Sequence, residues 1–105
     1  MNTTDWIRTM VDRIVAAFAP ERVILFGSHA RGDAGPQSDV DLLVILAAAT
    51  NKREAAVAIR RVLADIPLCK DIIVTTLEEV ARRGSVIGTV LLPALREGRV
   101  LYERG

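Results

Sequence analysis

Two aspartates, Asp39 and Asp41, stand two positions apart at the start of an otherwise apolar run that ends at Leu46. In a β-strand, such residues point to the same side of the sheet and lie roughly 6.6 Å apart. Carboxylates on an apolar strand are costly unless something compensates their charge, and carboxylate oxygens suit Mg²⁺. The pair therefore predicts a divalent-cation site. The structural alternative is that Asp39 caps a turn with Ser38 while Asp41 meets an arginine.

A glycine and a serine, Gly27 and Ser28, follow directly after the apolar run Val23–Phe26, which is typical of a buried strand. Glycine lets the backbone turn sharply and lets a ligand approach it closely. If Ser28 opens a helical turn, the free N–H groups and the serine hydroxyl form an anion-binding site. Taken alone, this pattern more often marks an ordinary turn.

A third acidic residue, Asp71, heads the next apolar and β-branched run, which ends at Thr76. If that strand lies beside the strand of Asp41, the two carboxylates approach each other, because neighbouring strands lie about 4.8 Å apart. Three carboxylates on one face could hold two magnesium ions about 4 Å apart and stabilise the attacking and leaving oxygens of an in-line phosphoryl displacement. Alternatively, Asp71 simply marks a strand start at the surface.

The elements that position these residues follow from hydrophobic periodicity and from turn-forming residues. Thr4 or Asp5 is expected to cap the first helix, and Thr50 or Asn51 the second. In chain order we expect a helix over Asp5–Ala19, a strand over Val23–Phe26, a loop over Gly27–Ser38 with one helical turn at Ser28–Arg31, a strand over Asp39–Leu46, a helix over Asn51–Ala64, a strand over Asp71–Thr76, a helical segment over Leu77–Glu97 interrupted near Gly84 or Gly88, and a strand over Arg99–Glu103. The expected fold is α/β (α+β), a small mixed β-sheet with helices packed on one face, in a single domain over residues 1–105.

Composition limits the classes of function. The 105 residues carry a net charge of +1, so nothing indicates a dedicated nucleic-acid surface. The single cysteine, Cys69, allows no intramolecular disulfide, and we expect it to be a small core residue. The N-terminal residues lack the pattern of a signal peptide, and no apolar stretch approaches the roughly 20 residues of a membrane span. We therefore expect a cytoplasmic protein without a membrane partner.

Two motifs together resemble a known family. Gly27–Gly32 reads Gly-Ser-His-Ala-Arg-Gly, and Ser38–Val44 reads Ser-Asp-Val-Asp-Leu-Leu-Val. Residue types and spacing resemble the signature of the polymerase-β nucleotidyltransferase superfamily. Within it, the chain looks like the minimal nucleotidyltransferase (MNT) group, often described as antitoxins paired with HEPN-domain proteins. The order of predicted elements is also similar, so the resemblance spans nearly the whole chain and implies a polymerase-β-like fold.

The resemblance implies roles for individual residues. Gly27 and Ser28 would bind the triphosphate of ATP, the nucleotide donor. Asp39, Asp41 and Asp71 would be the catalytic carboxylates and the ligands of two Mg²⁺ ions, with Asp71 helping to activate the attacking hydroxyl. Arg31 would touch phosphate or brace the loop; its alternative is a salt bridge to Asp33 or Asp39. His29 is given no catalytic part and is expected to face solvent.

The function implied for the group is transfer of AMP from ATP to a tyrosine hydroxyl of a HEPN-domain toxin, which silences the toxin. One alternative is a non-catalytic antitoxin that neutralises its toxin by contact, and another is the nucleotide-binding subunit of a larger transferase. We expect no second domain of the kind that larger family members use to bind an acceptor. We therefore expect a partner protein or self-association, as a homo-oligomer, to supply the acceptor surface.

Overall fold

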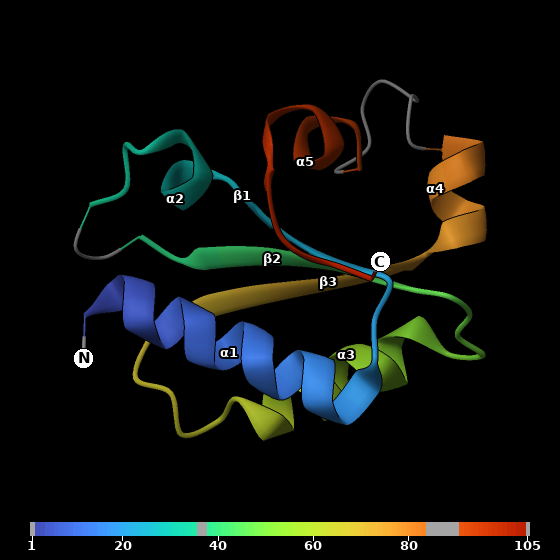
Figure 1. Ribbon diagram of the computed structural model, residues 1–105, viewed down its shortest axis with the longest axis horizontal. Coiled ribbons are helices and arrows are strands. Elements are labelled where there is room, and N and C mark those ends of the chain that lie inside the picture. The colour runs from blue at the N-terminus through green and yellow to red at the C-terminus, as the bar shows by residue number, and fades with distance from the viewer. Residues whose placement is uncertain (1, 36–37, 84–90, 105) are drawn as a thin grey trace.

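The computed structural model describes residues 2–35, 38–83 and 91–104 and centres on a four-stranded sheet (Figure 1). The strands are β1 (Arg22–Phe26), β2 (Val40–Leu46), β3 (Lys70–Thr76) and β4 (Arg99–Glu103), in the spatial order β3-β2-β1-β4. β1 runs antiparallel to both β2 and β4, whereas β3 runs parallel to β2. The sheet is therefore mixed, as expected, and the helix that connects β2 to β3 crosses one of its faces.

Helices lie on both faces of the sheet (Figure 1). α1 (Thr3–Phe18) and α3 (Lys52–Val62) cover one face, while α4 (Leu77–Arg83) and α5 (Leu91–Glu97) lie on the other. The larger core, on the α1 side, is built from Met10, Val11, Ile14, Val23, Leu25, Val40, Leu42, Val44, Ile59, Leu63, Ile66, Ile72 and Val74. The smaller core, on the α5 side, is built from Ile24, Leu43, Ile45 and Ala94.

The mixed α/β class is confirmed, but its layering differs from the expected single layer of helices. The reason is already present in the strand sequences. In β2, Leu42 and Val44 point to the larger core and Leu43 and Ile45 to the smaller one. A strand that is apolar on both faces needs a cover on both.

The ends of the helices are set by local capping. Asn2 caps α1: its side chain accepts a hydrogen bond from the Asp5 backbone N–H (2.9 Å), and the Asp5 carboxylate accepts one from the Asn2 N–H (3.4 Å). The expected cap at Thr4 or Asp5 is therefore wrong, because Asp5 takes the reciprocal position of a capping box. Asn51 caps α3, as expected, through the Glu54 N–H (3.0 Å). The interruption predicted near Gly84 or Gly88 lies outside the described residues.

The connection that leads into β3 contains Cys69, which is exposed. Its predicted burial is wrong because the residue belongs to neither core. Its carbonyl accepts a hydrogen bond from the Val40 N–H (2.9 Å). Across the described ranges, none of the helices has the length and apolar character needed to traverse a bilayer.

Candidate active site

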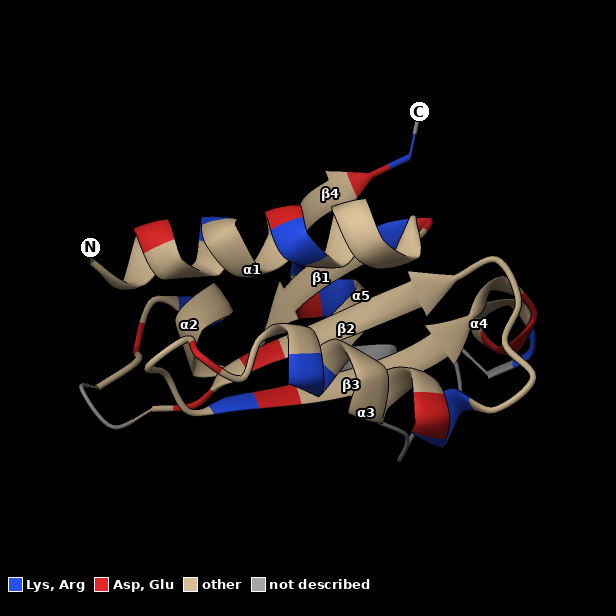
Figure 2. Cartoon of the chain, turned by 90° about the horizontal axis from the view of Figure 1, so that it is seen from below, with Lys and Arg blue, Asp and Glu red and all other residues tan. Residues whose placement is uncertain are grey.

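The predicted site residues meet at one end of the sheet. β1 ends at Phe26, which pairs with Asp41 of the antiparallel strand β2, and Gly27 follows immediately. Because β3 runs parallel to β2, its start lies beside the start of β2, and Asp71 is the register partner of Asp41. Figure 2 shows acidic residues on the adjacent starts of β2 and β3, close to the short helix α2 (Ser28–Arg31).

Asp41 lies on the α5 side of the sheet, because Leu43 and Ile45, two and four positions further along the strand, belong to the smaller core. Asp71 shares that side, since Ile73 packs against the same core. Asp39 lies just before β2, and its side chain is exposed. The strand was expected to begin at Asp39 but begins at Val40.

The charge of Asp41 is the clearest electrostatic feature of the site. Partial burial raises the pKa of its carboxyl, and the negative charges of Asp71 and then Asp39 raise the pKa further, while His29 and Arg31 offset part of the effect. Both neighbouring aspartates are therefore close enough to repel Asp41. Within the described residues, neither Asp39 nor Asp41 forms an ion pair, so the alternative in which Asp41 meets an arginine is not realised there.

Gly27 links the turn to this carboxylate. It has a φ of +74° and precedes α2, the single helical turn predicted at Ser28–Arg31. A Cβ at position 27 would lie 3.2 Å from the Cγ of Asp41 and closer still to Oδ2. The missing side chain thus leaves room for the Asp41 carboxylate. The Gly27 carbonyl accepts hydrogen bonds from the N–H groups of Ala30 (3.1 Å) and Arg31 (3.2 Å), which closes the turn.

Arg31 realises one of its two expected alternatives. Its Nε lies 3.3 Å from Oδ2 of Asp33, and both side chains are largely exposed. Arg31 still lies near enough to Asp41 to lower the pKa of that carboxyl. An exposed ion pair of this kind contributes at most about 1 kcal/mol, so Arg31 can exchange Asp33 for another anion at small cost.

Asp71 has a partner that the sequence did not reveal. Arg60 of α3 places Nη2 3.5 Å from Asp71 Oδ1, and both side chains are about half exposed. No sequence pattern marks Arg60, because its approach to Asp71 depends on how α3 packs over β3. In the part of the chain that the structure describes, no three His, Cys, Asp or Glu side chains are gathered closely enough to hold a metal ion together.

The donor set nevertheless suits magnesium. Mg²⁺ is usually held by one or two carboxylates together with substrate phosphates, rather than by a complete protein cage. Asp39 and Asp41 supply hard oxygen donors beside a turn with no side chain in the way. The carboxylate repulsion at Asp41 is the kind of charge imbalance that a cation relieves.

His29 differs from its expected solvent-facing position. It is half-buried, and its Nε2 lies 3.2 Å from the carbonyl oxygen of Ser38.

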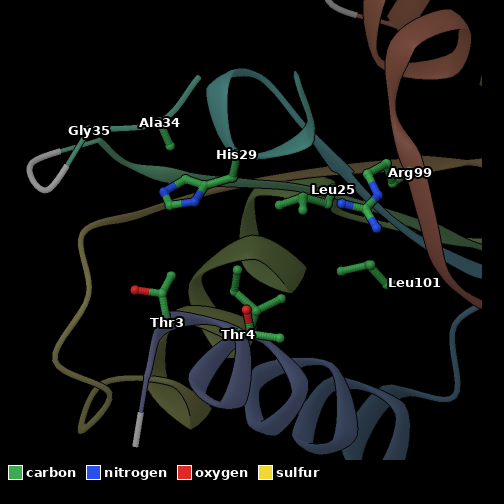
Figure 3. Close-up of a pocket in the computed structure, with 9 residues that line it drawn as sticks. Thr3, Thr4, Leu25, His29, Ala34, Gly35, Arg99 and Leu101 are labelled. Atoms are coloured by element: carbon green, nitrogen blue, oxygen red, sulfur yellow. The ribbon is translucent and has the colours of Figure 1, made fainter. Parts of the chain in front are cut away.

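The His29 ring also lines a pocket of about 470 Å³ between the start of α1, the loop after α2 and β4 (Figure 3). This pocket is lined by Thr3, Thr4, Ile7, Leu25, His29, Ala34, Gly35, Arg99 and Leu101. Leu25 and Leu101 belong to the α1 side, so the pocket opens on the face opposite Asp41.

The chain matches one protein family and is similar to several solved structures. Residues 6–92 match the family described as "Nucleotidyltransferase domain". Among solved structures, the chain is similar to a protein from Sulfolobus solfataricus assigned as a nucleotidyltransferase, with a TM-score of 0.67 and 23% identity over 95% of this chain and 79% of that chain. It is also similar to a toxin-antitoxin with AMP-PNP (TM-score 0.55, 18% identity, 91% and 73% coverage). A mutant of the toxin-antitoxin MntA-HpeT gives a TM-score of 0.51, with 18% identity and 99% and 75% coverage. At these identities the structural likeness shows a shared fold. No match was found among curated proteins.

Proposed function

The chain belongs to the nucleotidyltransferase domain family, and from that premise we propose that it transfers AMP from ATP to an acceptor hydroxyl in a Mg²⁺-dependent reaction. The proposed acceptor is a tyrosine of a HEPN-domain toxin, and the transfer silences that toxin. In this proposal residues 1–105 act as one catalytic domain in the cytoplasm, where ATP and magnesium are abundant. The observation that carries the proposal is the register of Asp41 beside Asp71, next to the Gly27 turn.

Nucleotide binding is assigned to the turn after β1. The missing side chain of Gly27 lets the turn lie directly against the Asp41 carboxylate, and Ser28 adds a hydroxyl at the start of α2. We assign the triphosphate to this turn, with Arg31 exchanging its exposed contact with Asp33 for a phosphate oxygen. AMP-PNP in one of the similar structures supports an adenine nucleotide as the donor.

The transfer itself needs one bond made and one broken. The acceptor oxygen forms a bond to the α-phosphorus of ATP, the bond from that phosphorus to the bridging oxygen breaks, and pyrophosphate leaves with the electron pair. The acceptor proton passes to a carboxylate, which we assign to Asp71. To reach the acceptor, the Asp71 side chain turns away from Arg60, which costs little because their contact is exposed.

We assign the neutralisation of negative charge at the reaction centre to bound metal. Asp39 and Asp41 would hold Mg²⁺, Asp71 would complete a second position, and bound magnesium supplies neutralisation of the phosphate charge and stabilisation of the leaving oxygen. The raised pKa of the Asp41 carboxyl, caused by burial and by the charges of Asp71 and Asp39, supports a site that is incomplete without a cation.

A protein acceptor is supported by the neighbours in structure and by the exposure of the site. Two of the similar structures are toxin-antitoxin assemblies. Asp39 and Asp71 are exposed, so a partner can bring its hydroxyl to them. A partner, or a second copy of this chain in a homo-oligomer, would then supply the acceptor surface.

The test is transfer of label. We expect ATP labelled at the α-phosphate, Mg²⁺ and the co-encoded protein to give a labelled partner, and the double variant Asp39→Asn plus Asp41→Asn to give none. Asp12→Asn, which removes an exposed carboxylate on α1, serves as the matched control and should transfer label at the wild-type rate. If the double variant neutralises the partner as well as wild type does, the protein acts by contact and the catalytic proposal is overturned.

A further inference from the structure

Asp39, which we assign to the cation, is held through its backbone rather than through its side chain. Asp39 lies outside β2, its side chain is exposed, and within the described residues its carboxylate makes no hydrogen bond or ion pair. The backbone on either side of Asp39 therefore sets the position of its Cα and Cβ, from which the side chain reaches the cation. The groups that hold those two peptide bonds decide where the side chain starts.

The peptide on the C-terminal side is anchored to the sheet. The Val40 N–H, which belongs to the Asp39–Val40 peptide, donates to the Cys69 carbonyl at 2.9 Å. This contact extends the pairing of β2 with the chain that leads into β3. It fixes the position of the Asp39–Val40 peptide group relative to the start of β3, where Asp71 lies.

The peptide on the N-terminal side is anchored by a side chain. His29 Nε2 lies 3.2 Å from the carbonyl oxygen of Ser38, an oxygen that can only accept, so Nε2 carries the proton. That oxygen and the Asp39 nitrogen belong to the same planar peptide group. A hydrogen bond to the oxygen therefore restrains the orientation of the peptide group that joins Ser38 to Asp39.

Ser38 is held at its other groups by its own loop. Its N–H donates to the Gly35 carbonyl (3.1 Å), and its hydroxyl accepts from the Gly35 N–H (2.9 Å). These contacts join Ser38 to Gly35 but do not join it to the turn at Gly27–Ser28. His29 does so, because it stands in α2 directly after Ser28 and reaches across to Ser38 (Figure 3 shows its ring pointing away from α2).

We propose that His29 is a positioning residue: its Nε2–H bond to the Ser38 carbonyl couples the Gly27–Ser28 turn to Asp39 and so sets the cation site that Asp39 and Asp41 share. The inference rests on the proposed function, since it concerns the same site. His29 touches neither acceptor nor nucleotide in this scheme. A sequence pattern does not reveal the role, because the bond joins residues nine positions apart across a loop.

Two substitutions at position 29 separate the hydrogen bond from the bulk of the ring. His29→Leu fills similar space without a donor, whereas His29→Gln retains an N–H donor. Thr3→Val, which alters another residue of the pocket beside His29, is the matched control. The probe is Mn²⁺ titrated in the presence of AMP-PNP and followed by calorimetry, with kcat and KM for ATP measured in parallel.

We expect His29→Leu to bind Mn²⁺ about 3- to 10-fold more weakly, the effect of one lost hydrogen bond. Its kcat should fall by a similar factor while KM for ATP changes less than about twofold, and His29→Gln should restore most of both. Thr3→Val should match wild type. Equal Mn²⁺ affinity in His29→Leu and wild type overturns the inference, as does a glutamine variant no better than leucine.

A failure of the proposed function gives a different result: wild type itself then binds no Mn²⁺ or transfers no nucleotide. If His29→Leu does not fold, the wild-type protein decides the question through its imidazole ¹⁵N spectrum. A ring protonated at Nε2 supports the hydrogen bond to Ser38. A ring protonated only at Nδ1 overturns it.

Discussion

The Asp41 carboxylate lies directly against the backbone of Gly27, close enough that a Cβ on Gly27 would stand 3.2 Å from Asp41 Cγ and closer still to Oδ2. The contact follows from the pairing of Phe26 with Asp41 across β1 and β2. It joins the turn assigned to phosphate to the carboxylate assigned to the cation. Glycine is needed at position 27 for two separate reasons, a φ of +74° and the space that Asp41 occupies.

These two reasons can be separated with a second glycine. Gly32 also has a positive φ, +81°, but a Cβ there would meet nothing within 4 Å. We expect Gly32→Ala, in the left-handed helical region (ψ 12°), to lose about 1–2 kcal/mol of unfolding free energy through backbone strain. Gly27→Ala, with a ψ of −155° in a region that essentially only glycine adopts, should lose about 1–3 kcal/mol. Only Gly27→Ala should also displace Asp41 and reduce transfer by about 100-fold. Urea unfolding and label transfer measure the two effects, and equal activity in the two variants would contradict the contact.

Asp41 should destabilise the metal-free protein. Burial, Asp71 and Asp39 raise the pKa of its carboxyl above the ordinary value of 3.8. The folded protein therefore holds that proton more tightly than the unfolded chain, and the resulting stability is present below pH 3.8 and lost as pH rises through the folded pKa. Asp41→Asn removes the charge, so we expect a higher Tm at neutral pH in EDTA, and no gain in strong acid.

The matched control for that measurement is Asp12→Asn on the exposed side of α1, which should leave Tm nearly unchanged. A lower Tm for Asp41→Asn at neutral pH would show that the Asp41 carboxylate is satisfied by protein groups. In that case the carboxylate repulsion would not be an argument for a cation.

Ligand binding should reverse the repulsion. With Mg²⁺ and AMP-PNP at about 100 times their Kd, the gain in unfolding free energy is about 2.7 kcal/mol, and each kcal/mol raises Tm by about 4–8 °C in a domain of this size. Removing Mg²⁺ with EDTA should abolish most of that rise. Differential scanning calorimetry checks it, and an equal rise with AMP-PNP in EDTA would argue against a metal.

Arg60 should compete with the cation for Asp71. Its Nη2 lies 3.5 Å from Asp71 Oδ1 in an exposed contact, which is worth at most about 1 kcal/mol. We therefore expect Arg60→Gln to bind Mn²⁺ up to about fivefold more tightly, since a full 1 kcal/mol corresponds to that factor. Arg61→Gln, which changes the exposed neighbour on α3, is the control. Weaker binding in Arg60→Gln would mean that Arg60 holds Asp71 in its working position.

A contact far from the site gives a further pH test. Arg13 of α1 donates to Asp65 (Nη2 to Oδ2, 3.1 Å) and to the Val62 carbonyl (3.1 Å) at the end of α3. The hydrogen bonds from Arg13 lower the pKa of the Asp65 carboxyl. That stability is present above the unfolded pKa and lost as pH falls through the folded value. Asp65→Asn should lower the midpoint of urea unfolding at neutral pH but not in strong acid, and a pH-independent loss would contradict the ion pair.

Short-range information in the sequence was sufficient for most of the helices and strands. The single helical turn at Ser28–Arg31 and the strand Arg99–Glu103 have the predicted bounds. The turn at Gly27 and the strand that carries Asp41 could be predicted because a strand, a sharp turn and a second strand each depend on neighbours in sequence. The same locality explains the correct cap at Asn51.

Short-range sequence patterns do not predict contacts between segments that are distant in the chain. The sequence could state that Asp71 approaches Asp41 if their strands are neighbours, but only the folded sheet decides that β3 pairs with β2 in that register. Arg60 beside Asp71, His29 beside Ser38 and the exposed Cys69 likewise depend on packing or on the path of a loop. Periodicity and turn propensity act over a few residues, whereas register and side-chain partners are set when separate elements bury their apolar faces together.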